Sequence, residues 1–222
     1  MCGRFTLWIQ FGDLLKAFPD FEFPETIPSR YNIAPSQDVA VVPNDGRSEV
    51  QFFRWGLVPH WADDPAIGNR MINARGETVA EKPSFRAAYR RRRCLILADG
   101  FYEWRREPGS GAKTPFYVRM ASGAPFAFAG LWEVWRPDDQ PLHSCTIITT
   151  RPNAVVAPIH NRMPVIIPRA AYDRWLDPEE KRPRELDNLL APYPSEEMVA
   201  YPVSRFVNNP TNDSRICVEP AA

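Results

Sequence analysis

The sequence predicts an α+β protein, one domain over residues 1–222, built around a mostly antiparallel, barrel-like β-sheet with a few short helices. Its 222 residues suit a single domain. The 24 prolines divide the chain into short segments, which favours strands and loops over long helices. The apolar segments are rich in β-branched and aromatic residues, as strands are.

Individual elements follow from these apolar segments. The predicted strands are VQFFRWGLVP (50–59), RCLILADGFYEW (93–104), TPFYVRM (114–120), PFAFAGLWEVW (125–135), CTIITT (145–150) and MPVIIP (163–168). The predicted helices are FGDLLKAF (11–18), SFRAAYRRRR (84–93), PRAAYDRWL (168–176) and RELDNLLA (184–191). Glycine and proline in REPGSGAKTP (106–115) predict a hairpin or loop.

Composition bears on which partners, metals and disulfides the protein can have. Lys+Arg and Asp+Glu are equal at 27 each, so charge neither requires nor excludes a nucleic-acid partner. The four cysteines are far apart and form no CxxC pattern, which argues against zinc and against a disulfide framework. We expect Cys94 and Cys145, which lie in apolar strands, to be buried and inert. No metal or organic cofactor is expected.

Compartment and partners are expectations of the same kind. No signal peptide precedes MCGRF, and no apolar run is long enough to span a membrane. We therefore expect a cytoplasmic protein, without membrane partners and monomeric, whose thiols stay reduced.

Cys2 directly follows the initiator methionine, where a small residue permits removal of Met1. Removal leaves a free α-amine and a thiol on one residue. An α-amine has a pKa of about 7.7–8.0 and is partly neutral near neutral pH, so it can attack an aldehyde and form a Schiff base. The thiol can then add to the imine and close a five-membered thiazolidine. An internal cysteine cannot do this, because its nitrogen is an amide.

Polar clusters stand at the ends of the apolar strands: RYNIAP (30–35), INARGET (72–78), ADGFYEW (98–104) and IHNRMP (159–164). Loops held by a rigid sheet often carry catalytic groups. Each cluster also has a structural explanation, such as Asn73 in a turn, Glu103 paired with an arginine, or His160 hydrogen-bonded in a loop.

Together with MCGRF, RWGLVPHW (54–61) and YPVSRFVNNP (201–210), these clusters resemble the SOS-response-associated peptidase (SRAP) family over nearly the whole chain. The family's members are abasic-site processing proteins. The resemblance implies that Cys2 captures the aldehyde of an abasic site in single-stranded DNA, or at a junction with double-stranded DNA. The resulting thiazolidine crosslink removes the imine that would otherwise drive β-elimination, and so shields the strand from cleavage.

Catalytic roles also follow from the resemblance. It puts Glu103 near the amine and His160 facing the sugar oxygen, where a carboxyl and an imidazole can transfer protons. Asn73 orients the aldehyde and the terminal amine. The thiol of Cys2 can also serve in autocatalytic removal of Met1. We expect association with the nucleoid when the protein is bound to DNA.

DNA contacts are predicted for cations beside these residues. Arg4, Arg75 and Arg162 each adjoin a proposed catalytic residue, where a guanidinium can pair with phosphate. The run Arg90–Arg93 is a candidate phosphate-binding stripe, with Arg90 as its first member. Without the other motifs, such a run is more typical of a solvent-exposed surface.

Two tryptophans complete the predicted DNA-binding set. Trp61 and Trp104 can stack on bases of a single strand. Core packing explains Trp104 equally well.

Three other functions remain open from the sequence. Cys2 can serve an N-terminal-nucleophile amidohydrolase, although no oxyanion-hole or carboxylate-clamp motif of glutamine amidotransferases is present. Cys2 with His160 can form a cysteine peptidase. The chain can also bind single-stranded DNA without covalent chemistry, in which case Cys2→Ala leaves affinity unchanged.

Overall fold

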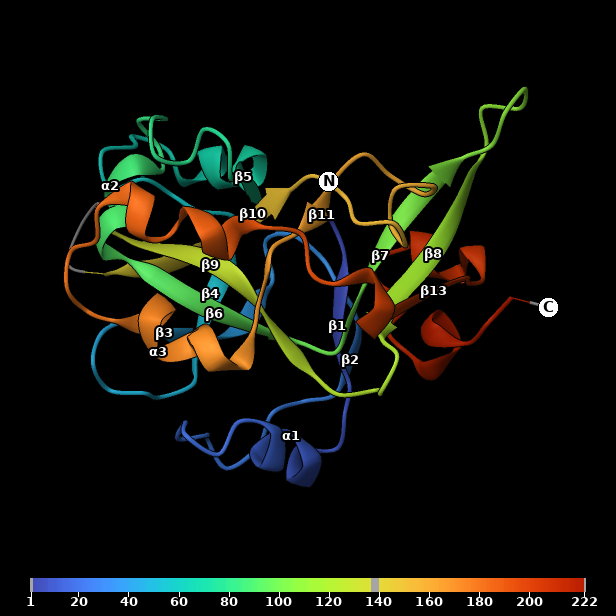
Figure 1. Ribbon diagram of the computed structural model, residues 1–222, viewed down its shortest axis with the longest axis horizontal. Coiled ribbons are helices and arrows are strands. Elements are labelled where there is room, and N and C mark those ends of the chain that lie inside the picture. Colours follow the sequence, from blue (N-terminus) through green and yellow to red (C-terminus); the bar gives the residue numbers. More distant parts are fainter. Residues whose placement is uncertain (1, 137–139, 222) are drawn as a thin grey trace.

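Two β-sheets lie side by side in the computed structural model, which describes residues 2–136 and 140–221 (Figure 1). The strands are β1 (Phe5–Leu7), β2 (Arg30–Ile33), β3 (Asp38–Pro43), β4 (Gln51–Trp55), β5 (Asn73–Arg75), β6 (Arg93–Ala98), β7 (Gly100–Arg106), β8 (Lys113–Met120), β9 (Phe126–Trp135), β10 (Leu142–Thr150), β11 (Met163–Pro164), β12 (Ile166–Ile167) and β13 (Met198–Pro202). The α-helices are α1 (Phe11–Ala17), α2 (Arg86–Arg91) and α3 (Tyr172–Leu176). The 3-10 helices are η1 (Pro65–Arg70), η2 (Arg169–Ala171), η3 (Pro183–Glu185), η4 (Asp187–Leu190), η5 (Ser195–Glu197), η6 (Arg205–Asn208) and η7 (Arg215–Val218).

The larger sheet closes on itself as a barrel. Strand β10 pairs with β4, β4 with β3, β3 with β6, β6 with β9, and β9 returns to β10. These pairs are antiparallel except for β10 with β4, and β5 also joins β10 in parallel. The predicted α+β class with a barrel-like, mostly antiparallel sheet is therefore confirmed.

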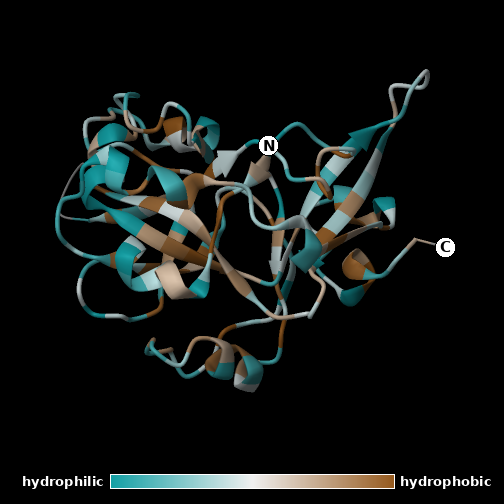
Figure 2. Cartoon of the chain, in the orientation of Figure 1, coloured by the Kyte–Doolittle hydropathy of each residue, from teal (hydrophilic) through white to brown (hydrophobic). Residues whose placement is uncertain are grey.

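The smaller sheet has the order β13-β8-β7-β1-β2 and is antiparallel throughout. One apolar cluster joins it to the barrel, because Phe5 of β1 packs edge-on against Trp55 and Phe128 at 5.1 and 5.6 Å between ring centroids. A second cluster, which includes Tyr102 and Tyr117, packs with the C-terminal 3-10 helices. Figure 2 shows apolar residues along the barrel strands and hydrophilic ones on α2.

Several predicted elements are confirmed. The helix over 11–18 is α1, and β7 and β8 form the expected hairpin, with Gly109 and Gly111 at φ of 78° and 66° in its loop. Cys94 and Cys145 are fully buried, and burial raises the pKa of each thiol. Among the described residues, no helix is both long and apolar enough to cross a membrane.

Other predictions of local structure are wrong. RELDNLLA forms two 3-10 helices, η3 and η4, in place of one α-helix. A 3-10 turn repeats every three residues, so Leu186 and Leu189 share a side and both are buried. The apolar segment 163–168 is divided between β11, which pairs with β10, and β12, which pairs with β9.

The segment 93–104 is also two strands in place of one. The chain leaves the barrel after β6 and enters the smaller sheet as β7, turning at Asp99. The Asp99 carboxylate accepts hydrogen bonds from the Trp8 and Ile9 backbone N–H groups at 2.6 and 2.7 Å. This corner therefore holds the end of β1 against the junction of the two sheets.

Candidate active site

Four residues predicted to be catalytic come together where the two sheets meet. Cys2 precedes β1, Asn73 begins β5, Glu103 lies within β7, and His160 lies in the loop between β10 and β11. The Asn73 side-chain amide donates to the Cys2 carbonyl at 2.7 Å. The His160 Nδ1 atom lies 3.8 Å from a Glu103 carboxylate oxygen. Figure 1 shows the N-terminus between β7 and β11, close to both sheets.

The position of Cys2 is fixed by the short strand that follows it. Phe5 pairs with Phe101 of β7, and the Tyr102 N–H donates to the Arg4 carbonyl at 2.9 Å. Gly100 leaves room for this packing, because a Cβ there would lie 2.2 Å from the Tyr117 ring. On its other side β1 pairs with β2, where Phe5 lies opposite Ile33, so the chain is held in register, and Cys2 is fully buried.

Burial sets the protonation states in the site. It raises the pKa of Glu103, which is 2% exposed, to about 7. It also raises the pKa of Cys2, to which the Glu103 charge adds, and lowers the pKa of His160. Near neutral pH the site therefore holds a thiol, a neutral imidazole and a carboxyl group able to give or take a proton.

The imidazole of His160 is oriented by its own loop. The Arg162 N–H donates to Nδ1 at 3.1 Å, and the His160 N–H donates to the Val156 carbonyl at 2.9 Å. Nδ1 also lies 3.3 Å from the Arg162 carbonyl oxygen, so the backbone of Arg162 contacts this nitrogen through both its N–H and its C=O. Asn153 holds the start of this loop, since its side-chain oxygen accepts from the Val155 and Val156 N–H groups.

Arg4 and Trp104, predicted to contact DNA, are engaged by the C-terminal segment. The Arg4 guanidinium donates to Asn32 Oδ1 at 2.6 Å and to the Val207 carbonyl at 2.9 Å. It lies 5.9 Å from the centre of the Trp104 ring, whose indole N–H donates to Asn208 at 2.8 Å. Side chains alternate along a strand, so Trp104 faces away from Glu103, into the second apolar cluster.

The other two arginines beside the site differ from each other. Arg75 is exposed at the end of β5 and forms no ion pair with any described residue. Arg162 is bonded to Glu77 through both of its terminal nitrogens, at 2.6 and 2.9 Å.

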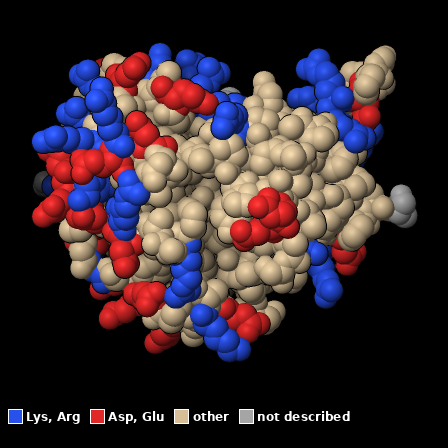
Figure 3. Space-filling view, in the orientation of Figure 1, with Lys and Arg blue, Asp and Glu red and all other residues tan. Residues whose placement is uncertain are grey.

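The predicted stripe Arg90–Arg93 is wrong as a continuous surface. Arg93 is fully buried, and its guanidinium donates to backbone carbonyls that include Trp175 O at 2.9 Å. Arg92 is bonded to Glu133 at 2.8 Å, and Arg90 and Arg91 both lie beside Glu180. Figure 3 shows acidic and basic side chains mixed over this end of the molecule, and α2 is far from the N-terminus in Figure 1.

Trp61 is 52% exposed in the loop after β4, where Asp63 and Asp64 share its surroundings. Carboxylates beside it repel phosphate, whereas its indole face is open to stack on a base.

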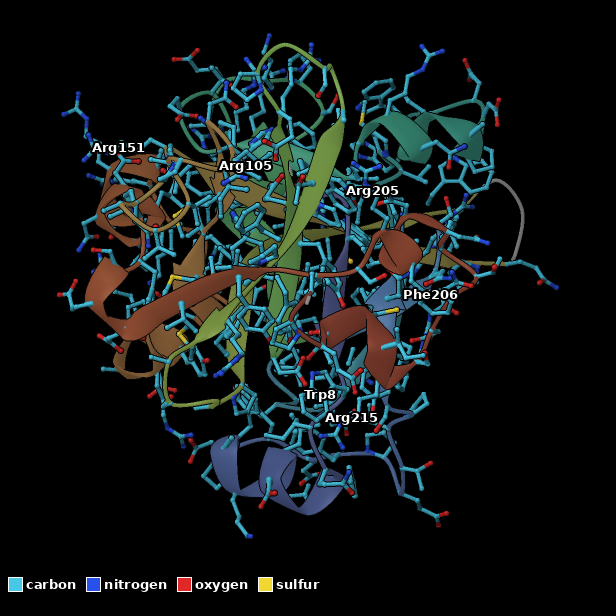
Figure 4. All side chains as sticks on the ribbon, turned by 90° about the vertical axis from the view of Figure 1, so that its right-hand side faces the viewer. Trp8, Arg105, Arg151, Arg205, Phe206 and Arg215 are labelled. Atoms are coloured by element: carbon cyan, nitrogen blue, oxygen red, sulfur yellow. The ribbon has the colours of Figure 1, made fainter. Side chains whose placement is uncertain are left out.

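Sequence reasoning missed two arginines near the site. Arg105 follows Glu103 by two residues and so shares its face of the sheet; its guanidinium lies 4.7 Å from the centre of the Phe116 ring. Arg151 is exposed directly after β10, whose residues Ile147–Thr149 pair with β5. Figure 4 shows both at the same end of the molecule, opposite Trp8 and Arg215. The strand alternation that includes Glu103 was a signal for Arg105.

Comparison with known proteins identifies the family of the chain. The sequence model of a family described as SOS response associated peptidase (SRAP) matches residues 1–210. The chain belongs to this family. It is 47% identical over 225 residues to abasic site processing protein YoqW of Bacillus subtilis, covering 99% of both chains. It is 34% identical to abasic site processing protein HMCES of chicken, over 75% of this chain and 56% of that protein.

Solved structures share the SRAP fold. A crystal structure of a protein from Bacteroides thetaiotaomicron superposes with a TM-score of 0.87 at 26% identity and full coverage of both chains. One from Bordetella bronchiseptica has a TM-score of 0.77 at 26% identity, covering 91% of this chain and all of that one.

Proposed function

We propose that this SRAP protein processes abasic sites in DNA, and that it does so by capturing their aldehyde covalently on Cys2. Relatives named abasic site processing proteins cover nearly the whole chain, which supports the substrate. The observation that carries the proposal is the neighbourhood of Cys2. Its carbonyl is held by Asn73 at 2.7 Å, beside a buried carboxyl group with a pKa of about 7.

The reaction begins once Met1 has been removed. The neutral α-amine of Cys2 attacks the aldehyde carbon of the open sugar and forms a carbinolamine. Loss of the former aldehyde oxygen as water gives the imine. The thiol sulfur then bonds to the imine carbon while its proton passes to the nitrogen, which closes the thiazolidine. The net change is one C–N bond and one C–S bond formed and one water released.

Proton transfers are assigned to the two titratable groups. Glu103, with a pKa of about 7, accepts a proton from the attacking amine and returns it to the departing oxygen. His160, whose lowered pKa keeps the imidazole neutral, faces the sugar and promotes opening of the ring. Asn73 holds the Cys2 backbone, so that the amine and the thiol approach one carbon.

The raised pKa of Cys2 fits the order of these steps. A thiol that stays protonated does not compete with the amine for the aldehyde. It reacts only after the electrophilic imine has formed next to it. The family description includes the word peptidase; for this chain we assign to Cys2 the hydrolysis of its own Met1–Cys2 bond.

The DNA substrate is proposed to be single-stranded, or a junction with a duplex. Arg75, exposed and without an ion-pair partner among the described residues, is the best-placed cation for a phosphate beside the lesion. Arg151, exposed directly after β10, is a second candidate, whereas Arg105 is paired with Glu107 at 3.1 Å. Contacts of Arg4, Arg90, Trp61 and Trp104 with DNA stay predictions.

Variants of Cys2 test the chemistry. With a single-stranded abasic oligonucleotide, the wild-type protein should give an adduct that survives denaturing electrophoresis without a reductant. Cys2→Ser keeps the amine and lacks the thiol, so its Schiff base should survive only after borohydride reduction. A wild-type adduct that also needs borohydride would contradict ring closure. Unchanged adduct formation by Cys2→Ser would do so as well.

A further inference from the structure

The side chain of Asn153 forms hydrogen bonds with two separate parts of the fold. Its oxygen accepts from the Val155 and Val156 N–H groups at 3.1 and 3.0 Å, at the start of the loop that carries His160. Its nitrogen donates to a different segment, at the Tyr193 carbonyl, over 2.8 Å. An amide side chain can accept and donate at once, so this residue joins the two segments.

Asn153 thereby ties a loop of the barrel to the smaller sheet. The His160 loop connects β10 with β11, which pair with each other in the barrel. Tyr193 precedes β13, and the Asn153 amide nitrogen also lies 3.3 Å from the sulfur of Met198, the first residue of β13. Strand β13 pairs with β8, and β8 with β7, the strand that carries Glu103. The anchor of the loop and Glu103 therefore belong to one sheet.

Val156 transmits this constraint to His160. Asn153 holds the Val156 N–H, and the Val156 carbonyl accepts the His160 N–H at 2.9 Å. Val156 and Ile159 are both buried, which fixes the face that the loop presents to the core. The imidazole Nδ1 then lies 3.8 Å from a Glu103 carboxylate oxygen. Because the two groups are carried by different sheets, a shift of the loop relative to the smaller sheet changes this separation.

We propose that Asn153 is a positioning residue, which anchors the His160 loop to the smaller sheet and so sets the imidazole against Glu103. The hydrogen bonds of its side chain go to protein groups, and it acts through His160. Its effect on the rate of capture rests on the function proposed above. The placement of His160 itself can be measured in the free protein, without DNA.

The titration of His160 reports this placement. Burial lowers the pKa of His160 below its ordinary value of 6.5, and the positive charges of the terminal amine, Lys113 and Arg162 act in the same direction, against a hydrogen bond with the Arg162 backbone that raises it. Glu103 faces the ring from β7, but with a pKa of about 7 it is largely protonated where the imidazole titrates. A loop released from its anchor admits water to the ring, so the pKa of His160 should rise toward 6.5.

Two variants separate the bonds that Asn153 makes, and neither changes the net charge. Asn153→Ala removes the bonds to both segments. Asn153→Ser keeps an oxygen that can accept from the Val155 and Val156 N–H groups, but its side chain is too short to reach Tyr193. The serine variant therefore breaks the anchor alone, and it takes the place of Asn153→Ala if that protein does not fold.

Ser144→Ala is the matched control. The Ser144 hydroxyl accepts the Val58 N–H at 2.9 Å, at the end of β10 that lies away from the His160 loop. Like Asn153→Ala, this variant removes a side-chain oxygen that holds a backbone N–H, without a change of charge. A general loss of stability is then common to the two proteins.

Two quantities are measured for each protein. An NMR titration of the free protein follows the imidazole protons, with His60 and His143 as internal references. The rate of adduct formation is taken at saturating single-stranded abasic oligonucleotide, so that a change in affinity does not enter. For Asn153→Ala we expect a higher pKa of His160 than in the wild-type protein. Because a displacement of about 1 Å costs a factor of about 100, the saturating rate should fall by about 10- to 100-fold. Asn153→Ser should lie between Asn153→Ala and wild type in both quantities.

Three results would overturn the positioning role. The first is a saturating rate of Asn153→Ala equal to that of Ser144→Ala. The second is a slower rate while His160 titrates as in the wild-type protein. The third is an Asn153→Ser protein that matches wild type in both quantities, since the bond to Tyr193 would then be dispensable. Failure of the proposed function gives a different pattern, in which the wild-type protein forms no adduct although the pKa of His160 still shifts in Asn153→Ala.

Discussion

Replacing Glu103 by glutamine should stabilise the protein at alkaline pH while slowing its reaction. The carboxyl is 2% exposed, and burial moves its pKa from an ordinary value of 4.5 to about 7. Between these two values the folded protein keeps a proton that the unfolded chain releases, so its stability falls as pH rises through this window. At about 1.4 kcal/mol per pKa unit, the loss is about 3 kcal/mol and is complete near pH 8.

Glutamine has no proton to release, so Glu103→Gln should escape this loss. The free energy of unfolding of both proteins is measured in urea at pH 5 and at pH 8. Glu196→Gln, at an exposed position, is the control. The stability gained over wild type should be larger at pH 8 than at pH 5 by about 2.5 kcal/mol, because about 0.8 kcal/mol of the loss is already present at pH 5. The rate of adduct formation should fall by a factor of about 100 to 10,000, as for loss of a proton-transfer group. A stability difference equal at the two pH values would refute the assignment of a buried, proton-binding carboxyl.

Three further substitutions test the frame around the site. Asn32→Ala removes the acceptor of the Arg4 guanidinium and the donor to three C-terminal carbonyls. It should lower the free energy of unfolding in urea by about 2–4 kcal/mol. A loss below about 1 kcal/mol would contradict this role. Gly100→Ala puts a Cβ 2.2 Å from the Tyr117 ring. It should lower the melting temperature, with a loss of stability of about 1–3 kcal/mol. An unchanged melting temperature would show that β1 and β7 tolerate a shift. Arg75→Ala should reduce the slope of log affinity against log salt by about 0.7 for single-stranded DNA; an unchanged slope would remove Arg75 from the phosphate contacts.

Strand content was largely predictable from the sequence, because apolar β-branched and aromatic segments are strong local signals. The division of 93–104 between two sheets was not, since the pattern of apolar residues does not reveal a change of partner strand. The dipeptide Asp99-Gly100, a turn signal inside the apolar segment, indicated the corner. Strands β1, β2, β3, β5 and β13 were missed; β2 and β5 lie in motifs whose polar residues drew a functional interpretation.

The candidate site shows a similar division. Family resemblance selected Cys2, Asn73, Glu103 and His160, and the fold brings them together although they come from four separate segments. No spacing in the chain predicts such a meeting, because it depends on how β5 and β7 are placed by the two sheets.

Arginine roles were the least predictable feature of the sequence. Arg93 binds buried carbonyls and Arg4 binds Asn32, although each belongs to a sequence pattern that also suits phosphate. A guanidinium has five hydrogen-bond donors, and the acceptors that surround it in the fold determine whether it binds protein groups or stays available to phosphate. Arg75 and Arg162 show this within one site, since the first is exposed and the second is bonded to Glu77.

Intact mass spectrometry tests the central claim most directly. The protein is weighed alone and after mixing with a single-stranded oligonucleotide carrying one abasic site. The account predicts a free protein without Met1, and an adduct whose mass is the sum of the two components less one water. The adduct should be absent for Cys2→Ala and for a tetrahydrofuran oligonucleotide. A processed wild-type protein that forms no adduct would contradict capture of the aldehyde by Cys2.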